Sequence, residues 1–490
     1  MSSPTRRRGL VLGATLACLV PSSAQAEPWR PLTPANQMQN QTQPGVSRDA
    51  AGVLHVVWGR DDSTLSGEEL LHTAIAPDGT IGAPSPIVTG WSTIGLPDVV
   101  ATPGGLLAII SGYVASQQPN IATAKSTDGG ATWAVDTSKL VRTVQGEPSL
   151  TAGADGTPFV AFGHVRVQRS FQRPAPEAPD PSYDYHATHA PGVGCCGNSP
   201  DIDRDDTGRV WLSWYSNDKV HPGNHVWQVD AGSGAPVGPA LVMPGSSTTF
   251  QGAQESIQPH GRAAIARQTG TPNMYTVARG GYPNPTNALV WRVGTPKPVN
   301  LTKKSSERPE AIRAMTVTGA PDGRMWVVWD TGITDSLRIH ARRSNKAGTR
   351  WGAETLVRPP KDSVDTYTLD ASVAPSGGLD VLGRFSFVNA ENIRQDSAPY
   401  LTRLLPTLTL TASPAKIRAG RKTTVRLRVT DAFDPVKGAT VKVGSERAVT
   451  DGGGRASLRL EPSRNTRSLR AVASAPGYAD GIIGIRVVRK

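Results

Sequence analysis

The chain of 490 residues carries 52 Lys and Arg against 40 Asp and Glu, a formal net charge of +12, and only three cysteines. So few cysteines exclude a disulfide framework, and a fold of this size must be held by its hydrophobic core. The charge is uneven, because Thr407–Lys490 has 17 Lys and Arg against 6 Asp and Glu. This distribution excludes a uniformly basic protein and assigns the basicity to the C-terminal region.

The N-terminus has the organisation of an export signal. Three arginines at positions 6–8 precede an apolar run, Gly9–Val20, and a small-residue site, Ala24–Ala26, follows. The run is too short for a membrane-spanning helix, and no later apolar stretch is long enough for one. Residues 1–26 are therefore predicted to be a signal peptide, by a general or a twin-arginine route. The mature protein is expected to be secreted and extracellular, with association to the cell wall as an option.

A phrase consisting of a short β-run, a glycine turn and a second β-run returns about every 52 residues. A period near 50 that carries several short strands is typical of a β-propeller, in which each repeat forms one four-stranded blade. Seven copies predict an all-β, seven-bladed β-propeller over residues 27–405, with a six-bladed ring as the alternative. The turn glycines are Gly52, Gly104, Gly156, Gly208, Gly261, Gly323 and Gly377.

The two ends of this region complement each other. In each repeat the run before the glycine is the innermost strand A, the run after it is strand B, and strands C and D follow. The last repeat lacks a strand D, and Pro28–Thr33 reads as one. The N-terminal segment is therefore predicted to complete the seventh blade and to remove a free sheet edge.

Two segments between strands C and D carry a more specific motif. Ser126–Trp133, STDGGATW, matches the Asp-box S-x-D-x-G-x-x-W, and Ser344–Trp351, SNKAGTRW, is a degenerate copy with Lys346 at the Asp position. With these motifs residues 27–405 resemble the Asp-box (BNR-repeat) propellers, the superfamily that includes sialidases. The resemblance implies that the boxes are structural and lie at the end of the ring opposite the ligand site. The residues given this structural role are Ser126, Asp128, Gly130, Trp133, Ser344, Gly348 and Trp351.

From residue 406 onward, segments that alternate with period two are separated by turn residues, which predicts an Ig-like β-sandwich over residues 406–490. The stretch GATVKVGSERAVTDGGGRASLRL resembles bacterial Ig-like (invasin-type) domains, which implies a spacer or adhesion module. A basic hairpin region could bind an acidic polymer, and solvated strand faces are the alternative. Aromatic residues are nearly absent there, so no specific nucleic-acid partner is expected. The basic residues are Arg418, Arg421, Lys422, Arg426 and Arg428.

Candidate ligand-binding residues can be chosen by the end of the propeller at which each connection lies. The A–B and C–D turns share one end, and the D–A and B–C connections share the other, where ligands usually bind. The segment Pro174–Pro200 feeds strand A of the fourth blade and contains adjacent cysteines, Cys195 and Cys196. They could form a vicinal disulfide, hold a soft metal with His186 and His189, or remain free or pair between molecules. Neither a metal nor another cofactor is predicted.

The B–C connection of the fourth blade, Tyr215–His221, is expected beside that segment. Asp218 and His221 are candidate acid–base residues, with ordinary solvated loop residues as the alternative. The ligand-contact candidates from the two connections are Tyr183, Tyr185, His186, His189 and Tyr215.

Aligning the B strands on their turn glycine gives an aromatic column that we expect in the core between blades. In this alignment arginines replace the aromatic residue in the fifth copy, at Arg267, and in the seventh, at Arg384 when counted from Gly378, and Arg60 lies just beyond the first column residue. Sialidases bind a sugar carboxylate through three arginines, so the resemblance implies that this trio binds an acid group; structural arginines are the alternative. The column residues are Trp58, Phe162, Trp214 and Trp329.

The run Asp201-Ile202-Asp203-Arg204-Asp205 has the D-x-D-x-D spacing of calcium loops. Its phase in the repeat instead assigns it to strand A and the following turn, which favours a structural role.

Two functions from different classes remain. The first is a secreted, monomeric, sialidase-like propeller that recognises a glycan or an acidic cell-surface polymer without catalysis. The alternative is an exo-glycosidase of sialidase type that cleaves a terminal acidic sugar. We favour binding, because no Tyr–Glu nucleophile pair can be assigned by spacing.

Overall fold

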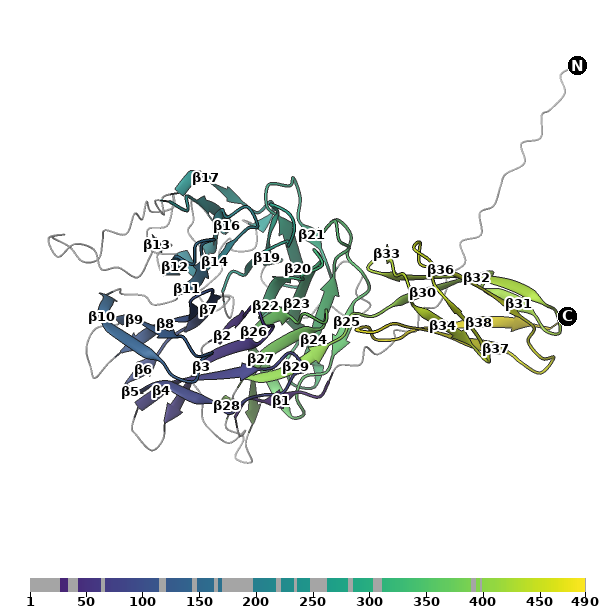
Figure 1. Cartoon of the computed structure of the whole chain (residues 1–490), viewed down its shortest axis with the longest axis horizontal. Coiled ribbons are helices and arrows are strands. Elements are labelled where there is room, and N and C mark those ends of the chain that lie inside the picture. The colour runs from purple at the N-terminus through teal and green to yellow at the C-terminus, as the bar shows by residue number, and fades with distance from the viewer. Residues whose placement is uncertain are drawn as a thin grey trace, which may run out of the picture.

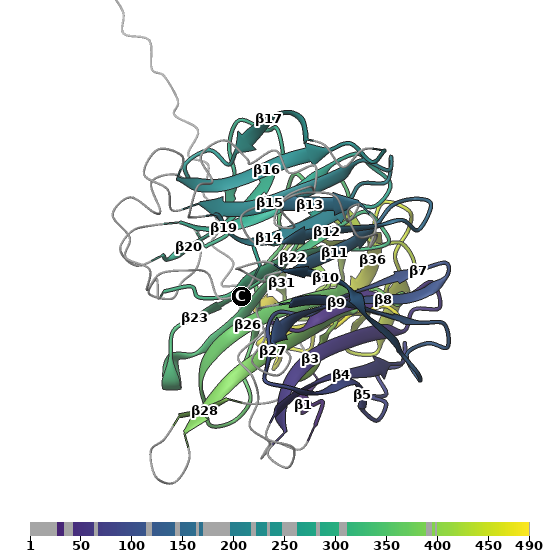
Figure 2. The same ribbon diagram turned by 90° about the vertical axis from the view of Figure 1, so that its left-hand side faces the viewer.

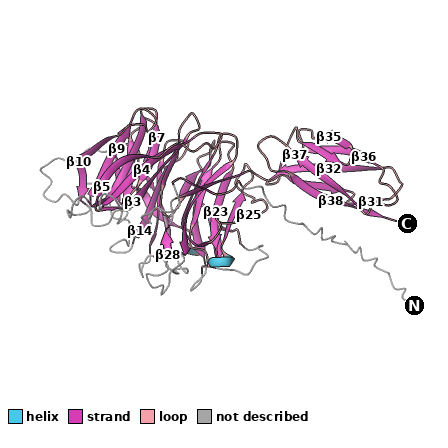
Figure 3. Cartoon of the chain, turned by 90° about the horizontal axis from the view of Figure 1, so that it is seen from below, coloured by secondary structure: helices cyan, strands magenta, loops and turns pink. Residues whose placement is uncertain are grey.

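Short strands separated by glycine turns make up nearly all of the structure (Figures 1 and 3). The one helical element that lies wholly within the described residues is a 3-10 turn, Thr334–Ser336. No helix among them is long and apolar enough to cross a membrane. The computed structural model describes residues 27–33, 43–62, 67–113, 120–142, 148–162, 166–169, 197–216, 222–232, 236–246, 262–280, 285–302, 311–388, 394–396 and 399–489.

Seven sheets are formed by the described residues up to position 404, and their strands follow the chain outward from the innermost one, except that the N-terminal β1 is the outermost strand of the last sheet. The first blade contains β2 (Gly45–Arg48), β3 (Leu54–Asp62), β4 (Gly67–Ile75) and β5 (Ser85–Trp91). The second contains β7 (Asp98–Thr102), β8 (Gly105–Tyr113), β9 (Asn120–Ser126) and β10 (Ala134–Arg142), and β6 (Thr93–Ile94) also pairs with β8. The third contains β11 (Ser149–Ala152), β12 (Pro158–Phe162) and β13 (Arg166–Arg169). The fourth contains β14 (Gly197–Arg204), β15 (Val210–Ser216), β16 (Gly223–Val229) and β17 (Pro236–Val242). The fifth contains β18 (Ile265–Arg267), β19 (Met274–Gly280), β20 (Asn287–Arg292) and β21 (Val299–Asn300). The sixth contains β22 (Met315–Gly319), β23 (Met325–Thr331), β24 (Arg338–Arg343) and β25 (Thr355–Val357). The last is β26 (Ser363–Val373), β27 (Leu379–Val388), β29 (Tyr400–Leu404), β1 (Arg30–Pro31), with β28 (Arg394–Asp396) on β27.

The first strands of these sheets line the centre of a closed ring. Each contacts the first strand of the next sheet, in the order β2, β7, β11, β14, β18, β22 and β26, and β26 contacts β2 again. Figure 2 shows these sheets around the ring. This arrangement is the predicted propeller. The column residues Trp58, Trp214 and Trp329 have no exposed surface, which confirms them as core; the side chain of Phe162 lies outside the described residues.

The N-terminal segment closes the ring, as predicted. Strand β1 pairs antiparallel with β29, with Arg30 opposite Leu401. The backbone N–H of Leu32 donates to the carbonyl of Pro399 at 2.9 Å, which continues the pairing past the strand end. The first and last segments of the propeller therefore share one blade, and no open sheet edge remains between them.

Leu32 tests this closure. Its side chain is 4% exposed and packs with core residues of the first and last blades, among them Leu54 and Leu382. We expect Leu32→Ala to lower the free energy of unfolding by about 2 to 3 kcal/mol, because burial is lost and a cavity remains. Pro31→Ala, at an exposed position of the same strand, is the matched control and should cost much less. Guanidinium unfolding curves measure both; equal losses would contradict a core role for Leu32.

The fifth blade corrects one sequence prediction. Its A–B turn is centred on Gly270, at φ +78°, and not on Gly261, which lies outside the described residues. The backbone N–H of Gln268 donates to the carbonyl of Asn273 across this turn. The run AAIAR therefore forms the innermost strand β18, and the extra residues of this repeat precede it. The apolar run after Gly261 imitates a strand B, which explains the error.

The C-terminal residues form two packed sheets. The alternation is clear in β36, where exposed and buried side chains follow each other over Arg455–Leu460. The buried side chains of both sheets meet in one apolar core that includes Val425, Leu427 and Val441. One sheet contains β30 (Thr409–Ser413), β32 (Thr423–Asp431), β33 (Asp434–Pro435) and β36 (Arg455–Leu460). The other contains β31 (Lys416–Arg418), β38 (Gly481–Val488), β37 (Ser468–Ser474), β34 (Thr440–Val443) and β35 (Glu446–Val449).

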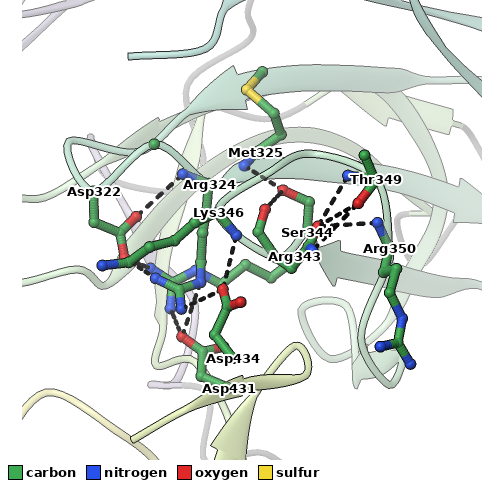
Figure 4. Close-up of polar contacts among 12 residues, drawn as sticks. Asp322, Arg324, Met325, Arg343, Ser344, Lys346, Thr349, Arg350, Asp431 and Asp434 are labelled. Carbon is green, nitrogen blue, oxygen red and sulfur yellow. Dashed lines mark hydrogen bonds and ion pairs between the residues drawn. The ribbon is translucent and has the colours of Figure 1, made fainter. Parts of the chain in front are cut away.

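The sandwich docks on the sixth blade through buried ion pairs (Figure 4). Arg343 binds Asp431 of the sandwich, and its Nη2 lies 3.0 Å from Asp322. Arg324 reaches Asp431 at 3.4 Å and Asp434 at 2.8 Å. These propeller residues belong to the A–B turn or border the C–D turn of the blade. The sandwich thus occupies the turn end of the ring, and the B–C and D–A connections belong to the opposite end.

Candidate functional site

The end of the ring away from the sandwich holds the starts of the A strands and the ends of the B strands. Most connections at this end lie outside the described residues. Those segments contain eight of the predicted site residues, which stay predictions. They are Tyr183, Tyr185, His186, His189, Cys195, Cys196, Asp218 and His221.

The arginine trio is not brought together. Arg60 lies near the end of β3 at this open end, and its Nε donates to Glu69 at 2.6 Å. Arg267 ends β18 at the opposite, turn end, where its Nε lies 3.6 Å from Asp206. Arg384 is 1% exposed inside the last blade. Because Arg267 and Arg60 lie at opposite ends of the ring, the three cannot share one carboxylate, and this part of the sialidase analogy is wrong.

Besides Arg60, Tyr215 is a predicted ligand residue that lies at the open end among the described residues, and it belongs to a polar cluster. The cluster draws on four successive blades: Tyr215 ends strand B of the fourth, Arg279 of the fifth and Asp330 of the sixth, and Asp365 begins strand A of the seventh. All four side chains are buried. We call Tyr215, Arg279, Asp330, Asp365 and Arg313 the funnel cluster.

The arginines of the funnel cluster fix its backbone and charge. Nη1 of Arg279 donates to the carbonyls of Ile312 and Arg313, at 3.0 and 3.3 Å. Burial lowers the pKa of Arg279 to about 10, an effect opposed by the nearby Asp330 and Tyr215. The Arg313 guanidinium forms an ion pair with Asp365. At neutral pH Arg279 therefore keeps its positive charge below the open end of the ring.

The carboxylate of Asp330 differs from the other groups of the funnel cluster in its hydrogen bonding. Its Oδ1 accepts hydrogen bonds from the backbone N–H groups of Arg313 and Ala314, at 2.8 and 2.9 Å. Its Oδ2 is buried and has no hydrogen-bond partner in the described part of the chain. Burial, with the charge of Asp365 in addition, raises the pKa of Asp330 to about 7, against the opposing effect of Arg279. Asp330 is thus poised between its neutral and ionised forms at neutral pH.

A second polar group lies on the innermost strands. The Ser149 hydroxyl lies 3.2 Å from Asp98 Oδ2 and 2.7 Å from Asp201 Oδ1, so it links three successive blades. Asp201 Oδ2 accepts from the backbone N–H of Ile265 at 2.9 Å. Burial raises the pKa of Asp98, and raises that of Asp201 to about 6. These hydrogen bonds join blade to blade.

Arg262 crosses the centre of the ring. It belongs to the fifth blade, yet its Nη2 donates to the carbonyls of Pro97 and Pro148, at 2.6 and 3.0 Å, before the second and third. Its backbone N–H donates to Gln43 Oε1 at 2.6 Å, before the first. Burial raises the pKa of Asp370 to about 7, and the positive charge of Arg262 opposes this shift. Arg262 therefore ties four blades together below the funnel.

The DIDRD run has the structural role that its repeat phase predicts. Asp203 Oδ2 accepts from the backbone N–H of Arg267 at 2.9 Å, as Asp201 does one step earlier. Asp205 lies in the turn and binds Thr207, Arg209 and the indole of Trp211. Within the described part of the chain, no group of three or more His, Cys, Asp or Glu side chains could hold a metal ion.

The first Asp-box also has the geometry of a turn device. Asp128 Oδ1 accepts from the backbone N–H of Thr132 at 3.0 Å, and Ser126 Oγ accepts from Gly130 N–H at 2.8 Å. The Trp133 indole donates to the Gly130 carbonyl. Hydrogen bonds from Thr132 and Ser126 lower the pKa of Asp128. The turn lies between β9 and β10, at the end of the ring away from the funnel cluster.

The segment Ser344–Trp351, predicted as a degenerate box, forms a similar turn and contacts the sandwich. Asn345 Oδ1 accepts from the backbone N–H groups of Thr349 and Arg350, the task of Asp128 in the first box. The freed Lys346 N–H donates to Asp434 of the sandwich at 2.8 Å. Ser344 and Trp351 form a β-bridge across the turn, and Gly348 adopts φ +68° beneath Tyr275.

The sequence reading missed four members of the funnel cluster: Arg279, Arg313, Asp330 and Asp365. A usable signal existed for Asp330. It directly follows the column residue Trp329, just as Tyr215 follows Trp214. The residue after the column tryptophan is thus carried to the open end of a blade.

No family model and no curated protein sequence matches the chain. Solved structures with similarity to it include a GH43_1 enzyme from Xanthomonas citri complexed with xylotriose, 13% identical over 77% of this chain and 90% of that one, at a TM-score of 0.31. The polysaccharide lyase Uly1 is 10% identical over 74% and 90%, at 0.43. The Bombyx mori GH32 beta-fructofuranosidase BmSUC1 is 11% identical over 94% and 89%, at 0.34. At such TM-scores these likenesses carry no argument about activity.

Proposed function

We propose that the propeller binds a carbohydrate at the end of the ring that carries the funnel cluster, and that it does so without cleaving it. The supporting observation is Asp330 Oδ2, a buried oxygen that no donor among the described residues reaches. Buried polar atoms are nearly always hydrogen-bonded, so an orphan at the ligand end of a ring is a place for a ligand hydroxyl. The positive charges of Arg279 and Arg313 beside it suit a sugar that carries an acid group.

Export is part of this proposal. Residues 1–26 have the organisation of a signal peptide, and residue 27 is the first of the closing segment. The backbone N–H of Glu27 already bonds the carbonyl of Arg403 at 3.1 Å. A protein cleaved after Ala26 would therefore keep the whole closing strand. We propose that it works outside the cell as a monomer.

A second candidate is glycoside cleavage, and the protonation of Asp330 favours it. A carboxyl with a pKa of about 7, near a carboxylate that pairs with Arg313, is the kind of couple that glycosidases use as acid and base. This version differs from the sialidase mechanism, because it needs no arginine trio.

One experiment separates the two functions. The mature protein is applied to a glycan array and to a panel of chromogenic glycosides, beside Asp330→Asn, which replaces the acceptor oxygen by a donor. We expect at least about a tenfold loss of glycan binding, the equivalent of one lost hydrogen bond to a charged group. The matched control is Asp205→Asn, an equally buried carboxylate at the turn end, which should bind within about twofold of the parent protein. Unchanged binding in Asp330→Asn would refute the site; turnover that this variant loses would establish the second candidate.

A further inference from the structure

The outer face of one sandwich sheet consists of arginines among small hydroxyl residues. Strand β32 exposes Arg426 and Arg428, and the adjacent β36 exposes Arg455 and Arg459. The pairing puts Arg428 directly opposite Arg455, and Arg426 opposite Ser457. The exposed positions of β30, β32 and β36 are Thr409, Thr411, Ser413, Thr424, Arg426, Arg428, Arg455, Ser457 and Arg459. We call this surface the arginine face.

Carboxylates are missing from the arginine face. None of its four arginines makes an ion pair among the described residues. Two of the six acids of the sandwich, Asp431 and Asp434, are instead used against the propeller. Like charges directly opposite on neighbouring strands are destabilising, so the Arg428–Arg455 pair costs stability in the free protein. An anion between the two guanidinium groups would remove that cost.

The arginine face is also free of the propeller. The sandwich contacts the ring through the end of β32 and the turn to β33, where Phe433 lies under Arg350. In Figure 1 the sandwich extends away from the ring beyond this contact. The face therefore remains open along most of its length, at the opposite side of the docking contact from the funnel cluster.

We propose that the arginine face binds an acidic polysaccharide, at a second site that is independent of the funnel cluster. Guanidinium forks bind carboxylates with two hydrogen bonds, and the interleaved hydroxyls can bond sugar hydroxyls. Arg426 and Arg428 are two residues apart on one strand, about 7 Å, which is a repeat that an extended polymer can follow. Single exposed ion pairs are weak, so affinity comes from several contacts on one chain. No aromatic side chain lies at the exposed positions of these strands for base stacking, which disfavours nucleic acid.

The test uses the full mature protein with polygalacturonate as the acidic polysaccharide, pullulan as a neutral one, and single-stranded DNA as another polyanion. We expect polygalacturonate to bind at low salt and to weaken steeply as salt rises. The double variant Arg428→Ser/Arg455→Ser should lose about tenfold in affinity at low salt. Its matched control is Arg470→Ser/Arg486→Ser, which removes the same charge from exposed positions of the other sheet and should stay within about twofold.

The outcomes are distinct. Equal losses in the two double variants would show that only bulk charge matters and would overturn the arginine face. Tighter binding of DNA than of polygalacturonate, with the same dependence on Arg428 and Arg455, would overturn the polysaccharide as partner. Absence of polygalacturonate binding at low salt would overturn the proposal as well. Because the funnel cluster is also proposed to bind a sugar with an acid group, the arginine face is judged by the difference between the two double variants, which both leave the funnel cluster intact.

Discussion

Arg343→Met is expected to lower the free energy of unfolding by about 3 to 5 kcal/mol and to release the sandwich from the ring. The Arg343 side chain is 6% exposed and Asp431, its partner, 3%. Without Arg343, the partners that Asp431 keeps among the described residues are Arg324 at 3.4 Å and the Tyr478 hydroxyl at 3.3 Å. Breaking a buried pair from one side costs more than the pair contributes, because the other charge stays buried.

Calorimetry and limited proteolysis measure this effect. A loosened sandwich should melt in a separate, earlier transition, and cleavage should appear near residue 406, between β29 and β30. The matched control is Arg342→Met, the preceding residue of β24, which binds Glu354 at 3.3 Å and no residue of the sandwich. A single transition in both variants, with equal losses, would contradict the latch role of Arg343.

The second large effect is a dependence of stability on pH that originates at Asp330. The folded-state pKa of about 7 lies above the ordinary value of 3.8. A raised pKa means that the folded protein holds the proton more tightly than the unfolded chain does. The contribution to stability is therefore complete below about pH 4 and is lost as pH rises through 7, on the order of 4 kcal/mol.

Urea unfolding at pH 5 and at pH 8.5 checks the sign. The parent protein should be less stable at pH 8.5, and Asp330→Asn should lose less between the two values, because an amide does not ionise. Part of the slope should remain, since Asp201 and Asp370 have pKa values raised to about 6 and 7. Asp128→Asn is the control: the pKa of Asp128 is lowered, so this carboxylate is ionised throughout the range and its removal should leave the slope unchanged. Equal slopes in the parent and Asp330→Asn would refute the assignment.

The ring could be predicted from the sequence because its signals are local. A turn glycine with positive φ, an apolar strand on each side and a buried tryptophan recur at fixed spacing, and each is set by residues close in the chain. The closing strand was predictable because one blade lacked a partner. The prediction of the turn in the fifth blade was wrong for the same local reason, because AAIAR satisfies the pattern of strand B as well as that of strand A.

The funnel cluster could not be predicted from the sequence, because its residues are far apart in the chain. Arg279, Asp330 and Asp365 come from three blades, and only the ring brings them to one end. Alignment by turn glycine found Arg267 instead, since an error of one strand moves a residue to the other end of a blade. Burial then raises the pKa of Asp330, and no single sequence reports burial.

The shared last blade has a consequence for how the propeller holds together. The hydroxyl of Thr402 donates to the carbonyl of Glu27, across 375 residues of chain. Each of the other sheets is built from neighbouring segments and could in principle open alone. The two chain ends are bonded to each other, so opening the final blade breaks a contact that closes a loop of nearly the whole propeller. The chain regains the conformational entropy lost in closing that loop only when the ring itself opens. The ring should therefore unfold as one cooperative unit, and a destabilising substitution at residue 32 should destabilise the first and the last sheet together.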